Sequence, residues 1–99
     1  MNGVLNIYRS TVGYIDNNQI LDTSFSIVGY INGDDILSPS YSIVGKVQNN
    51  GDILNGSYSI IGKVQNNGDI LSLSHSIVGY CDCSDKKAVG AAAVLLNLL

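Results

Sequence analysis

The sequence predicts an all-β fold, in which five short, pseudo-symmetric β-hairpins form a radial ring that is followed by one apolar C-terminal α-helix. A Val-Gly or Ile-Gly pair recurs with spacings of 16, 16, 17 and 17 residues, at 12–13, 28–29, 44–45, 61–62 and 78–79. An Ile-Leu or Val-Leu pair recurs between them, at 4–5, 20–21, 36–37, 53–54 and 70–71. Self-similarity at a fixed period indicates one repeated structural unit. We therefore expect a single domain, with the hairpin ring over 1–83 and the helix packed on it over 84–99.

Two of the units are nearly identical copies. Residues 40–54 read SYSIVGKVQNNGDIL and residues 57–71 read SYSIIGKVQNNGDIL, so they differ only where Ile61 replaces Val44. Such close identity indicates duplication of a structural unit. It also makes the strand register ambiguous, because a slip by one whole unit preserves the pattern.

Each unit is expected to contribute two strands. The segment SIVGYI (26–31) is short, apolar and rich in β-branched residues, which favours a strand. An Asn-Gly signal follows, as in INGDD (31–35) and VQNNGD (47–52), and predicts a hairpin with a type I′ turn. A shorter strand, such as DIL, comes next and leads into a second turn, such as LSPSYS. Gly, Asn and Ser interrupt the chain too often for the 3.6-residue apolar period of a helix.

One glycine occupies the same place in every unit, at Gly13, Gly29, Gly45, Gly62 and Gly79. Glycine inside a strand costs about 0.5–1 kcal/mol, so its recurrence needs a structural reason. A β-bulge or a close approach of two backbones would supply one. If the hairpins converge on a shared axis, the residue nearest the axis has to be small. We therefore interpret these glycines as structural.

The two ends of the repeat region are half-units, and this favours a closed ring. Four hairpins are complete within the chain, at 12–21, 28–37, 44–54 and 61–71. Val4-Leu5 lacks a preceding strand and 78–81 lacks a following one. Pairing these ends would make a fifth hairpin and remove exposed sheet edges. The competing design is an open solenoid with polar end caps, for which Val4-Leu5 is a poor candidate.

The repeat pattern VGYI-x-N/G-D-I-L-x-x-S-Y-S-I-VGKV resembles the repeats of the β-flower proteins, which occur in four-fold and five-fold forms. The resemblance covers 4–99 and implies short hairpins arranged like petals around a central axis, often followed by an Ala/Leu-rich helix. The five-fold form fits if the termini pair. The β-flower proteins have no assigned biochemical activity, so the resemblance implies a fold and leaves the function open.

The C-terminal segment SDKKAVGAAAVLLNLL (84–99) departs from the repeat and predicts a helix of about 13 residues. Ser84 or Asp85 can cap its N-terminus, and Gly90 is its weak point. Because the helix is apolar nearly all round, we expect it to be buried. It can cover one face of the ring and complete the core, or it can pack against a second copy of the chain through 88–99. Contact with a membrane is disfavoured by its short length and by the lack of a basic face.

Composition excludes several classes of protein and partner. Hydrophobic residues make up 45% of the chain and charged residues 13%, with a net charge of −3, so we expect a folded chain with no basic patch for nucleic acid. The chain does not open on a basic stretch followed by an apolar run, which argues against a signal peptide. Two cysteines are too few and too close for a disulfide framework. These features together favour a reducing, cytoplasmic location.

Two columns of aromatic residues are the best candidates for ligand binding. One column holds Phe25, Tyr41, Tyr58 and His75, with Arg9 in the first unit, and the other holds Tyr14, Tyr30, Lys46, Lys63 and Tyr80. By pseudo-symmetry each column forms a ring, whose flat apolar faces and polar tips suit a sugar, a peptide or a protein. The candidate ligand-binding residues are therefore Tyr14, Tyr30, Tyr41, Tyr58, His75 and Tyr80. The alternative interpretation is that these side chains simply cover the strand faces.

No catalytic residue and no cofactor is predicted. His75 is a variant of an aromatic column, and the serines beside it belong to turns in every unit. No set of nucleophile, base and orienting group can be assembled from them. The aspartates Asp35, Asp52 and Asp69 lie one to a turn, so they do not converge on a calcium ion and are expected to cap turns.

No metal site is predicted either. Cys81 and Cys83 point to the same face of a strand, but a structural zinc site needs four ligands. Cys81 instead fills the strand position that Ile31, Val47 and Val64 occupy in other units. A metal site shared between symmetry-related copies is the alternative for the two thiols.

The sequence alone does not define a biochemical function. We expect a small, non-catalytic structural or interaction module, whose partner is an unknown protein or a second copy bound through 88–99. The alternative is a ligand-binding module that uses the ring of Tyr side chains to bind a sugar or a peptide.

Overall fold

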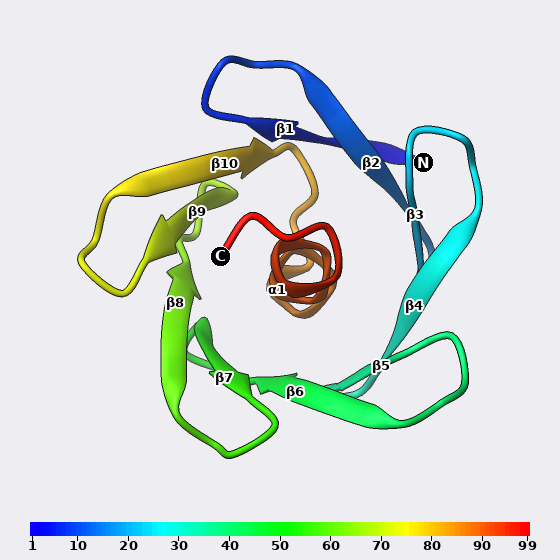
Figure 1. Ribbon diagram of the computed structural model, residues 1–99. Coiled ribbons are helices and arrows are strands. Elements are labelled where there is room, and N and C mark those ends of the chain that lie inside the picture. The colour runs from blue at the N-terminus through cyan, green and yellow to red at the C-terminus, as the bar shows by residue number, and fades with distance from the viewer.

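The computed structural model describes all 99 residues and consists of ten strands and one helix (Figure 1). The strands are β1 (Asn2–Asn6), β2 (Thr11–Asp16), β3 (Gln19–Leu21), β4 (Ile27–Asn32), β5 (Asp35–Leu37), β6 (Ile43–Val47), β7 (Asp52–Asn55), β8 (Ile60–Val64), β9 (Asp69–Ser72) and β10 (Ile77–Cys81), and the helix is α1 (Lys86–Leu95). All ten strands form one closed antiparallel sheet in chain order. The predicted all-β ring with a C-terminal helix is confirmed.

The two ends of the repeat region close the ring. Strand β1 pairs with β10 in antiparallel register, with Val4 opposite Cys81 and Leu5 opposite Tyr80. The half-units therefore complete each other as predicted, and the chain is not an open solenoid. Closure leaves no sheet edge with unpaired backbone groups.

Five hairpins project outward from the ring, and we call them petals (Figure 1). They are β1–β2, β3–β4, β5–β6, β7–β8 and β9–β10, and each lies wholly within the chain. The other set of hairpins, β2–β3, β4–β5, β6–β7 and β8–β9, links one petal to the next. Three of them carry the Asn-Gly signal, whereas the β2–β3 loop is Asn17-Asn18. The junction of the termini is the fifth link, so it lies between two petals.

The prediction of type I′ turns at the links is wrong, because only one residue in each link has a positive φ. In the two-residue loops that residue is Asn17 (57°) or Gly33 (62°). In the two longer units it is Gly51 (96°) or Gly68 (91°), which ends a three-residue loop. There the Gly51 N–H donates to the Gln48 carbonyl at 3.0 Å, as in a type I turn followed by a left-handed residue. The added loop residue accounts for the 17-residue spacing.

The core consists of two layers of five inward side chains around the helix. The odd-numbered strands contribute one layer, which consists of Val4, Ile20, Ile36, Ile53 and Ile70. The even-numbered strands contribute the other layer, which consists of Ile15, Ile31, Val47, Val64 and Cys81. All ten are buried. Cys81 is therefore a core residue in the column of Ile31, Val47 and Val64, as expected.

Helix α1 lies along the axis of the ring, inside it rather than across one face (Figure 1). Asp85 caps it by accepting hydrogen bonds from the Lys87 and Ala88 N–H groups. Residues 88–93 are all buried. They are mostly alanine because the ring is narrow, and a Cβ on Gly90 would lie only 2.6 Å from a methyl carbon of Val47. The helix therefore lies inside the ring, whereas we expected it to pack on the ring.

Helix α1 falls short of the length and hydropathy that a bilayer-crossing helix needs.

The five repeated glycines lie at irregularities of the ladder, and four of them lie under C-terminal leucines. At Gly62 an added Cβ would lie 2.6 Å from the Leu71 carbonyl oxygen and 2.8 Å from a methyl carbon of Leu99. Three other glycines have equivalent surroundings, since Gly13 lies under Leu96, Gly29 under Leu95 and Gly79 under Leu98. Gly45 has no such leucine above it. Register shifts accompany the pairing in every petal. Close approach and bulging therefore both explain the glycines.

Candidate functional site

The two aromatic columns meet where one petal adjoins the next, and we call each of these places a groove. The Tyr14 ring on β2 stacks on Phe25 from the tip of the next petal, with centroids 4.9 Å apart and planes 15° apart. The Tyr30 ring on β4 stacks in the same way on Tyr41, at 4.8 Å and 13°. A residue of one column therefore pairs with a residue of the other column across a groove, and the two columns do not form two independent circles.

The turn at each petal tip determines where the tip side chain lies. In the β3–β4 tip, the Phe25 N–H donates to the Asp22 carbonyl at 3.0 Å, and the Asp22 carboxylate accepts from the N–H groups of Ser24 and Ser26. Asn6, Ser38, Asn55 and Ser72 play the same capping role in the other tips. The fourth residue of each turn has a left-handed φ: Arg9 (62°), Phe25 (65°), Tyr41 (70°), Tyr58 (65°) and His75 (67°). This conformation turns the side chain back over the preceding petal.

A third groove spans the junction of the termini. The Arg9 guanidinium lies 4.4 Å from the centroid of the Tyr80 ring, in a cation–π contact. Arg9 takes the column position that an aromatic residue takes in the other petals. The contact therefore repeats the aromatic pairing with a cation at the point where the ring closes.

Lysine replaces tyrosine in the two remaining grooves, and an aspartate lies beside each lysine. The Lys46 ammonium lies 3.8 Å from the Asp35 carboxylate, and the Lys63 ammonium lies 3.3 Å from that of Asp52. The strand register explains the pairing, because Asp35 lies opposite Lys46 and Asp52 lies opposite Lys63. Two of the three aspartates in the turn column therefore have ion-pair partners, and Asp52 also accepts a hydrogen bond from the Asn50 side-chain amide in its turn at 3.1 Å.

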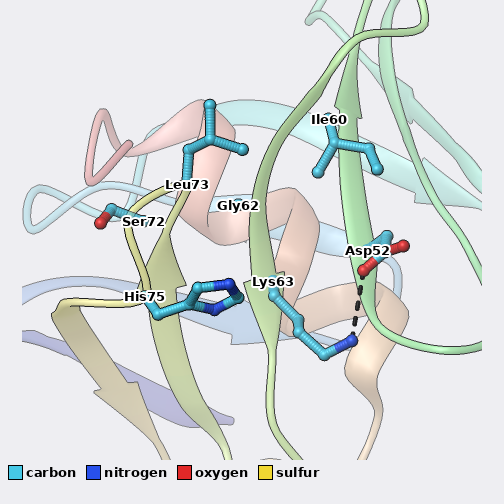
Figure 2. Close-up of a pocket in the computed structure, with 7 residues that line it drawn as sticks. All are labelled: Asp52, Ile60, Gly62, Lys63, Ser72, Leu73 and His75. Carbon is cyan, nitrogen blue, oxygen red and sulfur yellow. Dashed lines mark hydrogen bonds and ion pairs between the residues drawn. The ribbon is translucent and has the colours of Figure 1, made fainter.

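A pocket of about 240 Å³ lies in the groove between β8 and the β9–β10 tip, and Figure 2 shows it. Its lining residues are Asp52, Ile60, Gly62, Lys63, Ser72, Leu73 and His75. Sequence analysis singled out His75 for this region but missed Lys63 and Asp52 as its neighbours. The sequence places Lys63 in the Tyr14 column and His75 in the Phe25 column, but only the structure shows that these two columns pair.

Tyr30, in a groove, and Asp34, in the β4–β5 loop, have shifted pKa values. A hydrogen bond with Tyr41 raises the pKa of the Tyr30 hydroxyl. Lys87, at the start of α1, lowers the pKa of Asp34 through a hydrogen bond and ion pair. Tyr30 therefore stays neutral, and Asp34 stays ionised, over a wider pH range than usual.

The two cysteines are unpaired thiols. Burial raises the pKa of Cys81, so its thiol stays protonated and unreactive. Its sulfur accepts a weak hydrogen bond from the Cys83 N–H at 3.4 Å. Within the chain, Cys81 serves the core, and Cys83 begins the connection to α1.

The fold and its grooves define a class: a closed ring of five pseudo-symmetric hairpins around a central helix, with paired side chains between the petals. The family model of the 5-fold beta-flower proteins matches residues 1–96. The chain belongs to this family, as its repeats suggested, and the family has no known activity. No curated protein and no solved structure shows a significant match to the chain.

Proposed function

We propose that this chain is a non-catalytic interaction module, which binds a protein partner through the side chains at its petal tips. One observation carries the proposal. All five petals place a bulky side chain at a left-handed φ, where glycine or asparagine is the least strained residue. Each such residue costs about 1–2 kcal/mol of local strain, so five of them need a compensating role.

Stacking inside the protein offsets this strain only in part. Phe25 and Tyr41 have ring partners, and Arg9 has Tyr80. Tyr58 faces a column position that holds Lys46, and its side chain is 69% exposed. Tyr58 and His75 thus have a strained left-handed backbone, but no ring stacks on their side chains to offset the strain. This favours a role for these two side chains in binding a partner.

The tip residues also expose an unusual amount of apolar surface. Tyr8, Phe25, Tyr41, Tyr58 and Leu73 are all more than half exposed, and four exposed isoleucines, Ile27, Ile43, Ile60 and Ile77, begin the even strands after the tips. Exposed aromatic and aliphatic side chains that alternate with polar ones are typical of recognition surfaces.

Two further parts of the proposal concern chemistry and location. The hydroxyls near His75 are engaged in turn contacts, such as Ser72 with Ser74 at 3.0 Å, which supports a role without catalysis. The two unpaired thiols support a cytoplasmic location.

A variant with Phe25→Asn, Tyr41→Asn and Tyr58→Asn tests the proposal. Asparagine tolerates the left-handed conformation, so this variant should keep its fold by circular dichroism. Binders are selected from a displayed library of protein fragments on the wild-type chain and then measured against both proteins. We expect the triple variant to weaken binding at least about tenfold, because hot spots are rich in aromatic residues. Equal binding to both proteins, or recovery of no binder, would contradict the proposal.

The second candidate is a ligand-binding module for a sugar or a peptide. The exposed faces of Tyr41 and Tyr58 favour it, because flat aromatic faces with a polar edge suit a pyranose ring. A glycan array probed with the wild-type chain and the triple variant separates the two candidates. Glycan binding by the wild-type chain that is lost in the triple variant would support a sugar-binding module over a protein-binding module.

A further inference from the structure

The groove between β8 and the β9–β10 tip is the one that holds an open pocket. In the equivalent grooves at Tyr14 and Tyr30, a tyrosine ring from the even strand lies flat against the ring at the next petal tip. The chain itself therefore shows what this type of groove accommodates, namely a phenol ring stacked on the tip residue.

Lysine leaves this space unfilled at position 63. The Lys63 ammonium lies 3.3 Å from Asp52, on the side of the groove away from Leu73, as Figure 2 shows. The tip residue is His75, whose ring is smaller than the Tyr58 ring at the tip facing Lys46. An imidazole with no ring stacked on it thus occurs together with a pocket of about 240 Å³.

The pocket walls match a phenol ring chemically. Ile60 and Leu73 supply apolar contact on two sides, and the imidazole of His75 offers a flat face for stacking. The Lys63–Asp52 pair supplies a donor and an acceptor, which together can satisfy a hydroxyl group.

We propose that this pocket binds a phenol-type aromatic ring, stacked on His75 with its hydroxyl toward Lys63 and Asp52. The ligand takes the place that the tyrosine side chain fills in the equivalent grooves. The ring can belong to a tyrosine side chain of a peptide or to a free phenol. The inference goes beyond the proposed tip surface, because it concerns one pocket and does not use Phe25, Tyr41 or Tyr58.

The test is a titration of the ¹⁵N-labelled chain, followed by NMR, with N-acetyl-tyrosinamide, p-cresol and 4-methylcyclohexanol. We expect both phenols to shift the amide signals of the pocket, with dissociation constants on the order of millimolar for so few ligand atoms. The saturated alcohol has the same hydroxyl but no flat face, so it should bind more weakly. Tighter binding of N-acetyl-tyrosinamide than of p-cresol would indicate a peptide source, and the reverse would indicate a free phenol.

Two variants and one matched control sharpen the result. Lys63→Tyr should abolish binding, because it fills the pocket with the residue found at Tyr14, Tyr30 and Tyr80, and the fold tolerates tyrosine in that column. His75→Ala should raise the dissociation constant about two- to tenfold through loss of stacking. Lys46→Tyr makes the same change in the neighbouring groove and should leave binding unchanged.

Three outcomes would overturn the inference: no shifts at millimolar phenol, equal binding of 4-methylcyclohexanol, or unchanged binding by Lys63→Tyr. Loss of phenol binding in the Lys46→Tyr variant, together with retained binding in the Lys63→Tyr variant, would also overturn the inference. Failure here leaves the fragment selection on the petal tips unaffected, so the two proposals are separable.

Discussion

Gly79 lies where β10 and β1 join the two ends of the ring, and it has no room for a side chain. A Cβ there would lie 2.7 Å from the Leu5 carbonyl oxygen and 2.9 Å from a methyl carbon of Leu98. The backbone oxygen is held by the sheet and cannot move away cheaply. Gly3, on the neighbouring strand β1, has no atom within 4 Å of such a Cβ.

We therefore expect Gly79→Ala to destabilise the protein by about 1–3 kcal/mol through overpacking, whereas Gly3→Ala should change stability by less than about 0.5 kcal/mol. Urea denaturation of the two variants measures both values. Similar stabilities for the two variants would mean that ring closure does not require a glycine at position 79.

Residue columns could be read from the sequence, but their pairing could not. The repeat places Tyr14 and Phe25 in separate columns, 11 positions apart. Their stacking depends on the left-handed φ of Phe25, and an aromatic residue gives no local signal for that conformation. The same holds for Lys63 and His75, so the composition of the pocket was not predictable although its residue types were.

At the scale of elements, one ion pair joins the helix to the ring. Lys87, in the first turn of α1, contacts the carboxylate of Asp34 in the β4–β5 loop, 53 positions away in the sequence. Lysine at a helix N-terminus is unfavourable for the helix dipole, so this contact supplies a reason for its presence. No spacing rule connects the two residues, so the sequence alone could not predict this contact.

The lowered pKa of Asp34 gives a pH-dependent contribution to stability. A carboxylate with a folded pKa below its ordinary value of 3.8 stabilises the fold above that pH, and the contribution is lost as the pH falls through the folded pKa. We expect Asp34→Asn to be less stable than the wild type at pH 7, with the difference shrinking as the pH falls from 3.8 through the lowered folded pKa. Thermal unfolding across this pH range measures the difference.

The control for this prediction is Asp82→Asn, since Asp82 is exposed and forms no ion pair. Its difference from the wild type should not follow the Asp34 profile. If the difference between Asp34→Asn and the wild type stays the same from pH 7 down to the most acidic pH at which the wild type is folded, the ion pair with Lys87 does not stabilise the fold.

The burial of the helix was predictable but its position was not, and its 10 residues are fewer than the expected number of about 13. Its apolar character all round indicated burial, and Asp85 was among the two expected caps. Whether it lies across the ring or inside it depends on the width of the ring, which the strand pattern does not encode. The run of alanines at 91–93 is the feature that fits a narrow interior.

At the scale of the whole molecule, the ring encloses its own core only when the helix is present. The two layers of inward side chains pack against residues 88–93, and four of the repeated glycines pack under leucines that follow. The radius of gyration of 11.6 Å leaves little space for any other core. The helix thus supplies part of the core that the ring encloses.

A chain that ends at Asp85 should therefore lose cooperative thermal unfolding, because the burial removed is comparable with the roughly 5–15 kcal/mol that stabilises a small domain. Circular dichroism and sedimentation equilibrium on the truncated and full chains measure this. A chain lacking only Leu99, which is partly exposed, is the control and should remain folded. A folded, monomeric truncated chain would show instead that the helix is a dispensable cover.

The axial position of α1 also affects how the protein is made. All ten strands leave the ribosome before residues 88–93, and β1 waits for β10, its partner 77 positions later, for roughly 4–15 s of synthesis. During that time the near-identical units at 40–54 and 57–71 have no core to distinguish their registers. We therefore expect the native ring to form only after translation of the helix, with the nascent strands dependent on chaperone protection until then.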